Sequence, residues 1–260
     1  MSTANVPTRT TNQWFLQTKR NPQADIRLFC FPYAGGGTPI FRNWPLHLPA
    51  SIDLYAAQLP GRGARLNDPP FTNLMPLVEG LAEAILPSLD KPFAFMGHSM
   101  GGMIAFELSR LLRDRYGIEP LQLFISGRRA PHVPETDSPT YDLPEDLFIE
   151  EVRRLNGTPR EVLEHPELME MMIPILRADF SICQTYEFRR DRPLGCPMAV
   201  FGGVEDTEVS REQLEAWREH TTGPFSLRLF PGDHFFVQTQ QQLFLRALSQ
   251  ELIKLAEPLR

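Results

Sequence analysis

The chain has 260 residues, of which 42% are hydrophobic and 22% are charged, and its formal net charge is −6. This length and composition allow a sizeable buried core, and the acidic balance argues against a nucleic-acid-binding surface. No apolar run approaches the roughly 18 residues that a membrane span needs. The polar first twenty residues predict no signal peptide.

The three cysteines, Cys30, Cys183 and Cys196, are odd in number and show no spacing typical of metal ligands. We therefore expect reduced thiols in a cytoplasmic protein that uses no metal and no cofactor.

Short apolar runs alternate with helical patterns in the first half of the chain. Residues 1–12 have no apolar period and predict a disordered start, whereas 14–16 predict a short edge strand. Strands are expected over 26–31, 52–59, 93–96 and 121–126, and helices over 41–48, 74–85 and from Met103 to a cap at Gly117. Strands separated by helices imply right-handed crossovers and a mostly parallel sheet flanked by helices.

This alternation lapses between residues 130 and 192. Helical patterns cover 143–155 and 166–188, and Pro174 is expected to kink or interrupt the second helix. One side of that helix is expected to carry Leu168, Met171, Met172, Ile175, Leu176 and Phe180. Strands over 198–202 and 226–230 then alternate with helices over 211–221 and 240–256. We expect an α/β core of residues 1–129 and 193–260, with 130–192 inserted as a helical lid over the carboxyl edge of the sheet.

A G-x-S-x-G motif, Gly97-His98-Ser99-Met100-Gly101, lies between a predicted strand and a predicted helix. In a turn this tight, side chains two residues before and two residues after the serine would collide, and glycine at both positions avoids this. Ser99 then adopts a strained backbone conformation that projects its hydroxyl. The following helix aims its first N–H groups at the same point. The motif therefore predicts that Ser99 is a nucleophile.

A nucleophilic serine needs a base and a group that orients the base. His234 follows the last predicted strand and is the candidate base, whereas His98 should point away from Ser99. The other four histidines, His47, His132, His165 and His220, are expected to be solvent-exposed. Asp206 follows the strand 198–202 and is the candidate acid. The chain order Ser99, Asp206, His234 is the order found in α/β-hydrolases.

Two other acids compete with Asp206 for this role. Glu205 is its immediate neighbour, and Asp233 is too close in sequence to His234 to orient its ring.

An oxyanion hole requires two N–H donors. One is expected from the backbone of Met100, directly after the nucleophile. The other is expected from Ala34 in the loop Tyr33-Ala34-Gly35-Gly36-Gly37, which follows the strand 26–31. This loop lacks the G-x-G-x-x-G pattern of a dinucleotide-binding turn, which leaves acyl transfer through an acyl-serine as the predicted chemistry.

Nearly the whole chain resembles the stand-alone type II thioesterases of polyketide synthases and nonribosomal peptide synthetases. The resemblance rests on residues 28–36, Gln58-Leu-Pro-Gly-Arg62, the motif at 97–101, Ser126-Gly-Arg-Arg-Ala-Pro131, Phe201-Gly-Gly203 with Asp206, and 231–236. It implies an α/β-hydrolase fold with a mobile lid. It also implies hydrolysis of acyl groups from the phosphopantetheine arm of acyl or peptidyl carrier proteins, which clears stalled or misprimed units in antibiotic biosynthesis.

The residues alone do not separate thioester from oxyester hydrolysis. A general carboxylesterase acting on small esters, and a non-catalytic hydrolase fold that binds carrier proteins, are the alternatives. We expect a monomer with no membrane and no nucleic-acid partner. Because carrier proteins present acidic helices, Arg128 with Arg129, and Arg62 with Arg65, are candidates for a basic docking patch; their alternative role is ion pairing within the fold.

Overall fold

The computed structural model describes residues 13–17 and 19–257 and contains one sheet of seven strands in the order β1-β3-β2-β4-β5-β6-β7. The strands are β1 (Phe15–Leu16), β2 (Ile26–Phe31), β3 (Ile52–Ala57), β4 (Phe93–His98), β5 (Leu123–Ser126), β6 (Met198–Gly203) and β7 (Phe225–Phe230). Only β1 is antiparallel to its neighbour. The predicted edge strand and mostly parallel sheet are confirmed, and the predicted disordered start lies outside the described residues.

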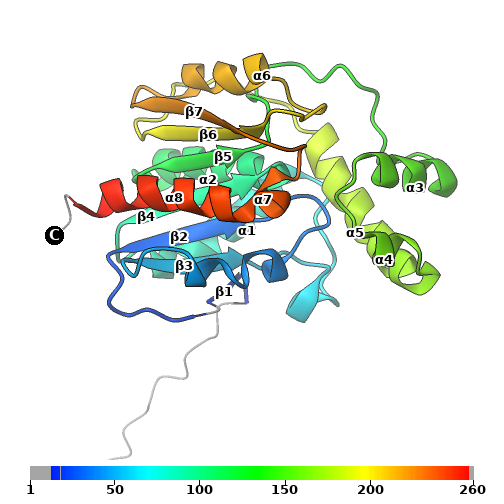
Figure 1. The fold of residues 1–260 in the computed structure, drawn as a ribbon, viewed down its shortest axis with the longest axis horizontal. Helices are drawn as coiled ribbons and strands as arrows, with labels where there is room; N and C mark the ends of the chain where they lie inside the picture. Colours follow the sequence, from blue (N-terminus) through cyan, green and yellow to red (C-terminus); the bar gives the residue numbers. More distant parts are fainter. Residues whose placement is uncertain (1–12, 18, 258–260) are drawn as a thin grey trace, which may run out of the picture.

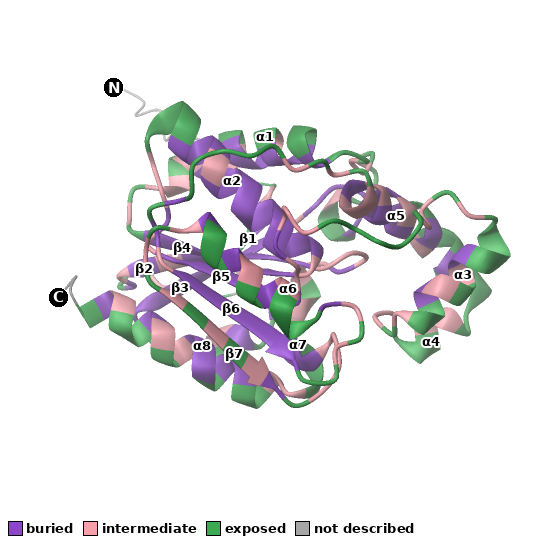
Figure 2. Cartoon of the chain, turned by 90° about the horizontal axis from the view of Figure 1, so that it is seen from above, coloured by how far each residue is buried: buried purple, intermediate pink, exposed green. Residues whose placement is uncertain are grey.

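Helices cover both faces of this sheet, as Figures 1 and 2 show. In chain order, the α-helices of the described residues are α1 (Leu74–Ile85), α2 (Met100–Tyr116), α3 (Glu145–Arg154), α4 (Arg160–Leu163), α5 (Pro166–Gln184), α6 (Arg211–Glu215), α7 (Phe236–Thr239) and α8 (Gln241–Ala256). The side chains of α1, α2 and α6 form one apolar core with the sheet, and those of α7 and α8 form a second core on the opposite face. No helix among residues 13–17 and 19–257 is long and apolar enough to cross a membrane.

Helices α3, α4 and α5 lie together beyond one end of the sheet (Figure 1). They have a small apolar core of their own, formed by Phe148, Val152, Met169, Ile173, Leu176 and Phe180. Ile182, near the end of α5, belongs instead to the main core on the α2 face of the sheet. The inserted segment is therefore divided between a separate small core and the body of the molecule.

Two details expected for α5 differ in the structure. The helix is not interrupted at Pro174, which is exposed, and a kink at this residue stays a prediction. Leu168 and Met171 are 44% and 53% exposed. The buried stripe starts one residue later, at Met169, because the first half of α5 is apolar on several sides and only its packing partners select one of them.

Short 3₁₀ segments replace two of the predicted helices. The pattern over 41–48 forms η1 (Thr38–Phe41) and η2 (Trp44–Leu46), each with a proline near its start. The predicted helix over 211–221 ends as an α-helix at Glu215 and continues as η5 (Ala216–His220).

The surface position predicted for His220 is wrong. His220 is only 8% exposed, and its ring packs against Phe106, Trp217 and Phe188. Nε2 of His220 lies 2.7 Å from Nδ1 of His132. In a 3₁₀ segment, residues three apart lie on the same side, so His220 follows Trp217 into the core. Burial, together with the neighbouring His132, lowers the pKa of His220 to about 4.

Candidate active site

Ser99 stands at the turn between β4 and α2, with φ 53° and ψ −116°. A Cβ on Gly97 would lie 2.0 Å from the carbonyl oxygen of Gly101, and a Cβ on Gly101 would lie 2.1 Å from that of Phe31. Both glycines are therefore required by the close approach of backbone to backbone. The Ser99 N–H donates to the carbonyl of Ser126 over 2.8 Å, which fixes this strained turn to β5.

Asp206 and His234 follow β6 and β7, and the sheet brings them into contact. His234 Nδ1 lies 2.8 Å from Oδ2 of Asp206, whose side chain is fully buried. The other carboxylate oxygen, Oδ1, accepts the backbone N–H groups of Glu208 and Val209 over 2.9 and 3.1 Å. The carboxylate is thus held on both oxygens, and an N–H on Nδ1 of His234 leaves Nε2 free to accept a proton.

The two competing acids do not reach His234. Glu205 is exposed, and its backbone N–H donates to the carbonyl of Gly232. Asp233 Oδ1 accepts the N–H of Phe235 over 2.9 Å, and its Oδ2 accepts from Nδ2 of Asn156 over 3.3 Å. Asp233 therefore shapes the loop that carries His234.

His98 points toward β5, where its Nδ1 lies 3.0 Å from Oγ of Ser126. Its ring lies 5.1 Å from that of His234 and is surrounded by Tyr33, Phe235 and Phe236. Burial, and then the neighbouring His234, lower the pKa of His98 well below its usual value. The neutral imidazole of His98 therefore packs against the ring of His234, the candidate base. Apart from the position of His98 in the motif, nothing in the sequence predicted this contact.

Ala34, Ser99 and His234 line one cavity of about 170 Å³ at the carboxyl edge of the sheet. The opposite wall comes from the inserted helices, through residues that include Val152, Leu176 and Phe180. Met100, the other expected donor, is the first residue of α2 and is fully buried. The residues predicted for nucleophile, base and oxyanion binding are therefore brought to the same place.

The four arginines predicted as a docking patch make internal contacts. Arg62 forms a buried ion pair with Asp179, Arg65 pairs with Asp68, and Arg129 pairs with Glu135. Arg128 lines the cavity that contains Ser99, its Nη2 lies 3.4 Å from Sδ of Met103, and burial lowers its pKa. The alternative role, ion pairing within the fold, is therefore observed for three of the four. Arg128 lines the cavity of the site, and so does Arg129.

A strand, a strained G-x-S-x-G turn and a helix, followed by an aspartate and a histidine in contact, define the chain as an α/β-hydrolase. A family model described as a thioesterase domain matches residues 26–252. The chain belongs to this thioesterase family.

Several relatives are similar over almost their full length. The chain is 45% identical to the gramicidin S biosynthesis protein GrsT of Aneurinibacillus migulanus, over 93% of this chain and 94% of GrsT. It is 43% identical to a Brevibacillus parabrevis protein named linear gramicidin dehydrogenase LgrE, over 93% of each chain. Among solved structures, the RedJ thioesterase of the Streptomyces coelicolor prodiginine pathway matches with a TM-score of 0.84 and 36% identity, covering 89% of this chain and 87% of RedJ.

Proposed function

We propose that this protein is a type II thioesterase, which hydrolyses acyl thioesters from the phosphopantetheine arm of acyl or peptidyl carrier proteins. Ser99 is the nucleophile, His234 the general base and Asp206 the group that orients it. The contact between Asp206 and His234 in the loops beside Ser99 is the observation that carries this proposal. The relatives in gramicidin S and prodiginine biosynthesis support the substrate class.

In the acylation step, Nε2 of His234 takes the proton of the Ser99 hydroxyl as Oγ attacks the thioester carbonyl. The negative charge moves onto the carbonyl oxygen, which accepts the backbone N–H groups of Met100 and Ala34. The intermediate then collapses, the C–S bond breaks, and the imidazolium returns its proton to the departing sulfur. A thiol has a pKa of about 8.5, so its thiolate leaves with less need for protonation than an alkoxide.

Deacylation repeats these steps with water in place of the serine hydroxyl. His234 takes a proton from water, the hydroxide adds to the acyl carbon, and the second tetrahedral intermediate expels Ser99 Oγ. The proton on His234 returns to Oγ, which leaves a free acid and the original enzyme. Every residue in this scheme comes from one chain, so the chemistry needs no residue from a second copy.

The dehydrogenase name of LgrE is not carried over to this chain. Residues 33–37 lack the G-x-G-x-x-G pattern that a dinucleotide requires at a strand-to-helix turn. At the turn between β4 and α2, the strained residue is Ser99.

The three free cysteines of this chain fit a reducing compartment, so we place the thioesterase in the cytoplasm.

Three substrates with one acyl group test this function: an acyl-carrier protein, a free acyl-pantetheine thioester and a p-nitrophenyl ester. We expect kcat/KM to be highest for the carrier-bound thioester, because docking of the carrier protein adds binding energy to the same chemistry. Equal or faster turnover of the ester would instead indicate a general carboxylesterase. Carrier-protein binding without turnover of any substrate would indicate a non-catalytic binding protein.

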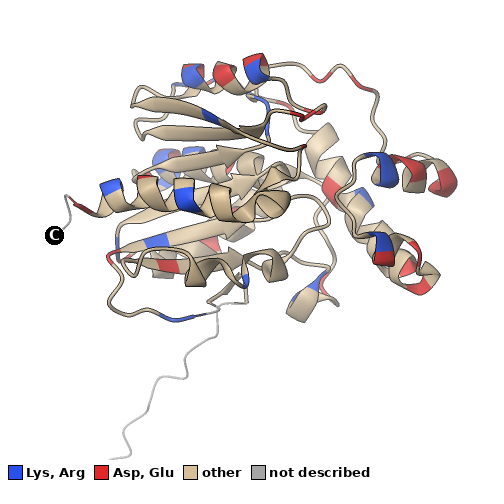
Figure 3. Ribbon diagram, in the orientation of Figure 1, with Lys and Arg blue, Asp and Glu red and all other residues tan. Residues whose placement is uncertain are grey.

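We further propose that the inserted segment 130–192 covers the site and that its first part moves. Contacts between α3 and the catalytic loops are polar and exposed, such as the Arg154–Glu208 ion pair at 2.8 Å, and exposed pairs contribute little to stability. Acidic residues begin α3 and arginines end it, with Glu145 and Asp146 in the first turn and Arg153 and Arg154 in the last. Both colours are visible along this helix in Figure 3. The apolar contacts of α3 are instead with α5 in their shared small core, where Phe148 packs against Phe180.

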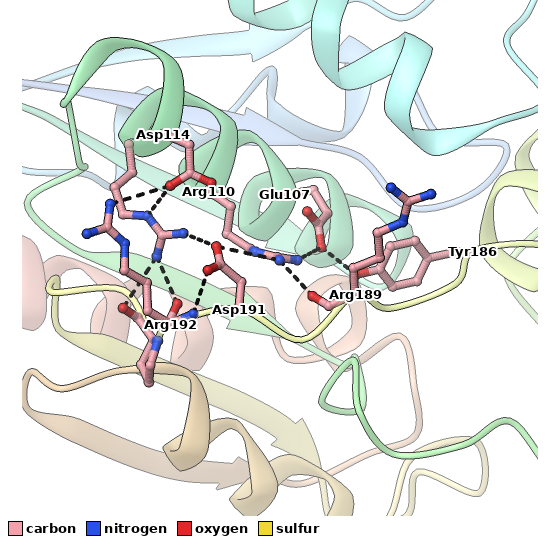
Figure 4. A network of polar contacts seen from close by, with 9 residues as sticks. Glu107, Arg110, Asp114, Tyr186, Arg189, Asp191 and Arg192 are labelled. Atoms are coloured by element: carbon pink, nitrogen blue, oxygen red, sulfur yellow. Dashed lines mark hydrogen bonds and ion pairs between the residues drawn. The ribbon is translucent and has the colours of Figure 1, made fainter.

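The end of the inserted segment is attached much more firmly. Figure 4 shows a network between α2 and residues 186–192, in which Tyr186 donates to Glu107 and Arg110 donates to the Arg189 carbonyl over 2.7 Å. Arg113 donates to the carbonyl of Arg192 and pairs with Asp191. We place the moving part in α3, α4 and the first half of α5.

Hydrogen exchange measures this difference directly. We expect the amides of α3 and α4 to exchange much faster than those of α2 and β4, because their opening does not disturb the main core. The amides at the end of α5, around Ile182, should be protected in comparison with α3, because this part of the helix packs in the main core. Equally high protection across the whole insertion would show a fixed subdomain and would contradict a mobile lid.

A further inference from the structure

Asp179 and Arg62 form a buried ion pair that none of the steps above uses. Their side chains are 2% and 10% exposed. The two guanidinium nitrogens of Arg62 donate to the two carboxylate oxygens of Asp179, each over 2.7 Å. Asp179 lies on α5 in the inserted segment, whereas Arg62 lies in the loop after β3, so the pair joins two distant parts of the chain.

Both members of the pair also bind the loop that carries Ala34. The N–H of Gly35 donates to Oδ2 of Asp179 over 2.7 Å. Nη1 of Arg62 donates to the carbonyl oxygen of Gly36 over 2.9 Å. One ion pair therefore holds two backbone groups just after Ala34: Asp179 accepts the N–H of Gly35, and Arg62 donates to the carbonyl of Gly36.

The loop itself is a tight turn that presses against α5. The Gly36 N–H donates to the carbonyl of Tyr33 over 2.9 Å, and Gly35 has a left-handed φ of +76°, as the third residue of a type II turn requires. A Cβ on Gly35 would lie 2.5 Å from Cδ2 of Leu176, one helical turn before Asp179. The position of the turn thus depends on α5.

A buried ion pair is an expensive way to join two elements. Removing both charges from water costs more than their attraction returns in many proteins, and apolar pairs of similar volume are often as stable. Stability alone therefore does not require this pair. What apolar side chains cannot supply is a bond to a backbone N–H and another to a backbone carbonyl, which together set the orientation of a turn.

We propose that Arg62 and Asp179 are positioning residues, which orient the turn at 33–36 so that the Ala34 N–H faces the developing oxyanion. This inference rests on the proposed role of Ala34 as an oxyanion donor. It predicts that loss of the pair weakens binding of the transition state while leaving binding of the ground-state substrate almost unchanged. The inserted segment would then contribute directly to catalysis through the second half of α5.

The double variant Arg62→Met, Asp179→Leu separates positioning from stability, because it removes both charges together. The Gly35 N–H and the Gly36 carbonyl lose these partners, so we expect a modestly lower Tm. We expect kcat per folded enzyme to fall roughly 10- to 100-fold, with KM within about twofold. Asp68→Asn is the matched control: it removes a carboxylate from the Arg65 pair in the same loop and should leave kcat unchanged. Active-site labelling with a fluorophosphonate normalises each rate to folded enzyme.

Two inhibitors give a second readout. A trifluoromethyl ketone forms a tetrahedral oxyanion on Ser99, and its affinity should fall by about the same factor as kcat. An S-alkyl pantetheine thioether has no thioester carbonyl for Ser99 to attack and forms no oxyanion, and its affinity should not change. If the double variant does not fold, the single variants Asp179→Asn and Arg62→Lys are measured below their own unfolding temperatures. We expect them to show smaller losses of kcat and of trifluoromethyl ketone affinity, with KM and thioether affinity unchanged.

Wild-type kcat per folded enzyme in these variants would overturn the proposal, as would a raised KM with unchanged kcat. Either result would leave thioester hydrolysis by the wild-type protein intact. A failure of the proposed function is different, because the wild-type protein would then not hydrolyse thioesters at all.

Discussion

Ser99→Ala is expected to lower thioester turnover by at least about a thousandfold. The substitution removes the oxygen that attacks the acyl carbon, so the variant retains only substrate binding and the oxyanion donors. Initial rates on an acyl-carrier protein, measured with free-thiol detection, give this ratio.

The variant should remain folded. The Ser99 side chain makes no capping hydrogen bond to α2, so alanine removes no helix contact and keeps the same strained backbone. Thermal unfolding should therefore be close to that of the wild type. Turnover near the wild-type value, in a preparation shown by fluorophosphonate labelling to lack contaminating esterase, would exclude Ser99 as the nucleophile.

Asp206→Asn is expected to be the next most severe change, with kcat lowered by about 10³- to 10⁴-fold. Because Oδ1 accepts two backbone N–H groups, an asparagine places its carbonyl oxygen there and turns its NH₂ toward His234. Nδ1 of His234 must then accept a hydrogen bond, which puts the ring proton on Nε2. The imidazole is held in the tautomer that cannot take the Ser99 proton.

Glu205→Gln provides the matched control, since it makes the same change of charge one residue earlier on an exposed side chain. We expect it to change kcat less than about threefold, because surface charges are screened and do not contact the base. Both variants are compared by kcat and by the ring-proton NMR signals of His234. The reverse ranking of the two variants would move the acid to Glu205.

The order of the core elements and the candidate site are predictable from the sequence for one reason. In a parallel sheet, every strand ends at the same edge, so residues that directly follow strands in sequence are neighbours in space. Ser99, Asp206 and His234 each follow a predicted strand. The observed strands β4, β6 and β7 end at His98, Gly203 and Phe230, so the site residues lie at the strand end or in the loop that follows it. Glycine spacing adds the tight turn at 97–101.

The burial of individual side chains was less predictable. His220 and the apolar stripe of α5 were misassigned, because each belongs to a segment whose neighbours come from elsewhere in the chain. A helical period shows which residues share a side, but it does not show which side meets the core. Only packing against Phe106 and Phe188 for the first, and against Phe148 for the second, decides this.

The sequence by itself determined the alternation of strands and helices, the nucleophile turn and the chain order of the candidate triad, because these depend on local spacing. Only the tertiary structure brings Arg62 and Asp179, which are 117 residues apart, into an ion pair that binds the loop of Ala34. No local pattern marks such a pair, since each charge taken alone resembles a solvated surface residue. Burial becomes possible only when the fold brings the opposite charge and the backbone groups of the turn to the same point.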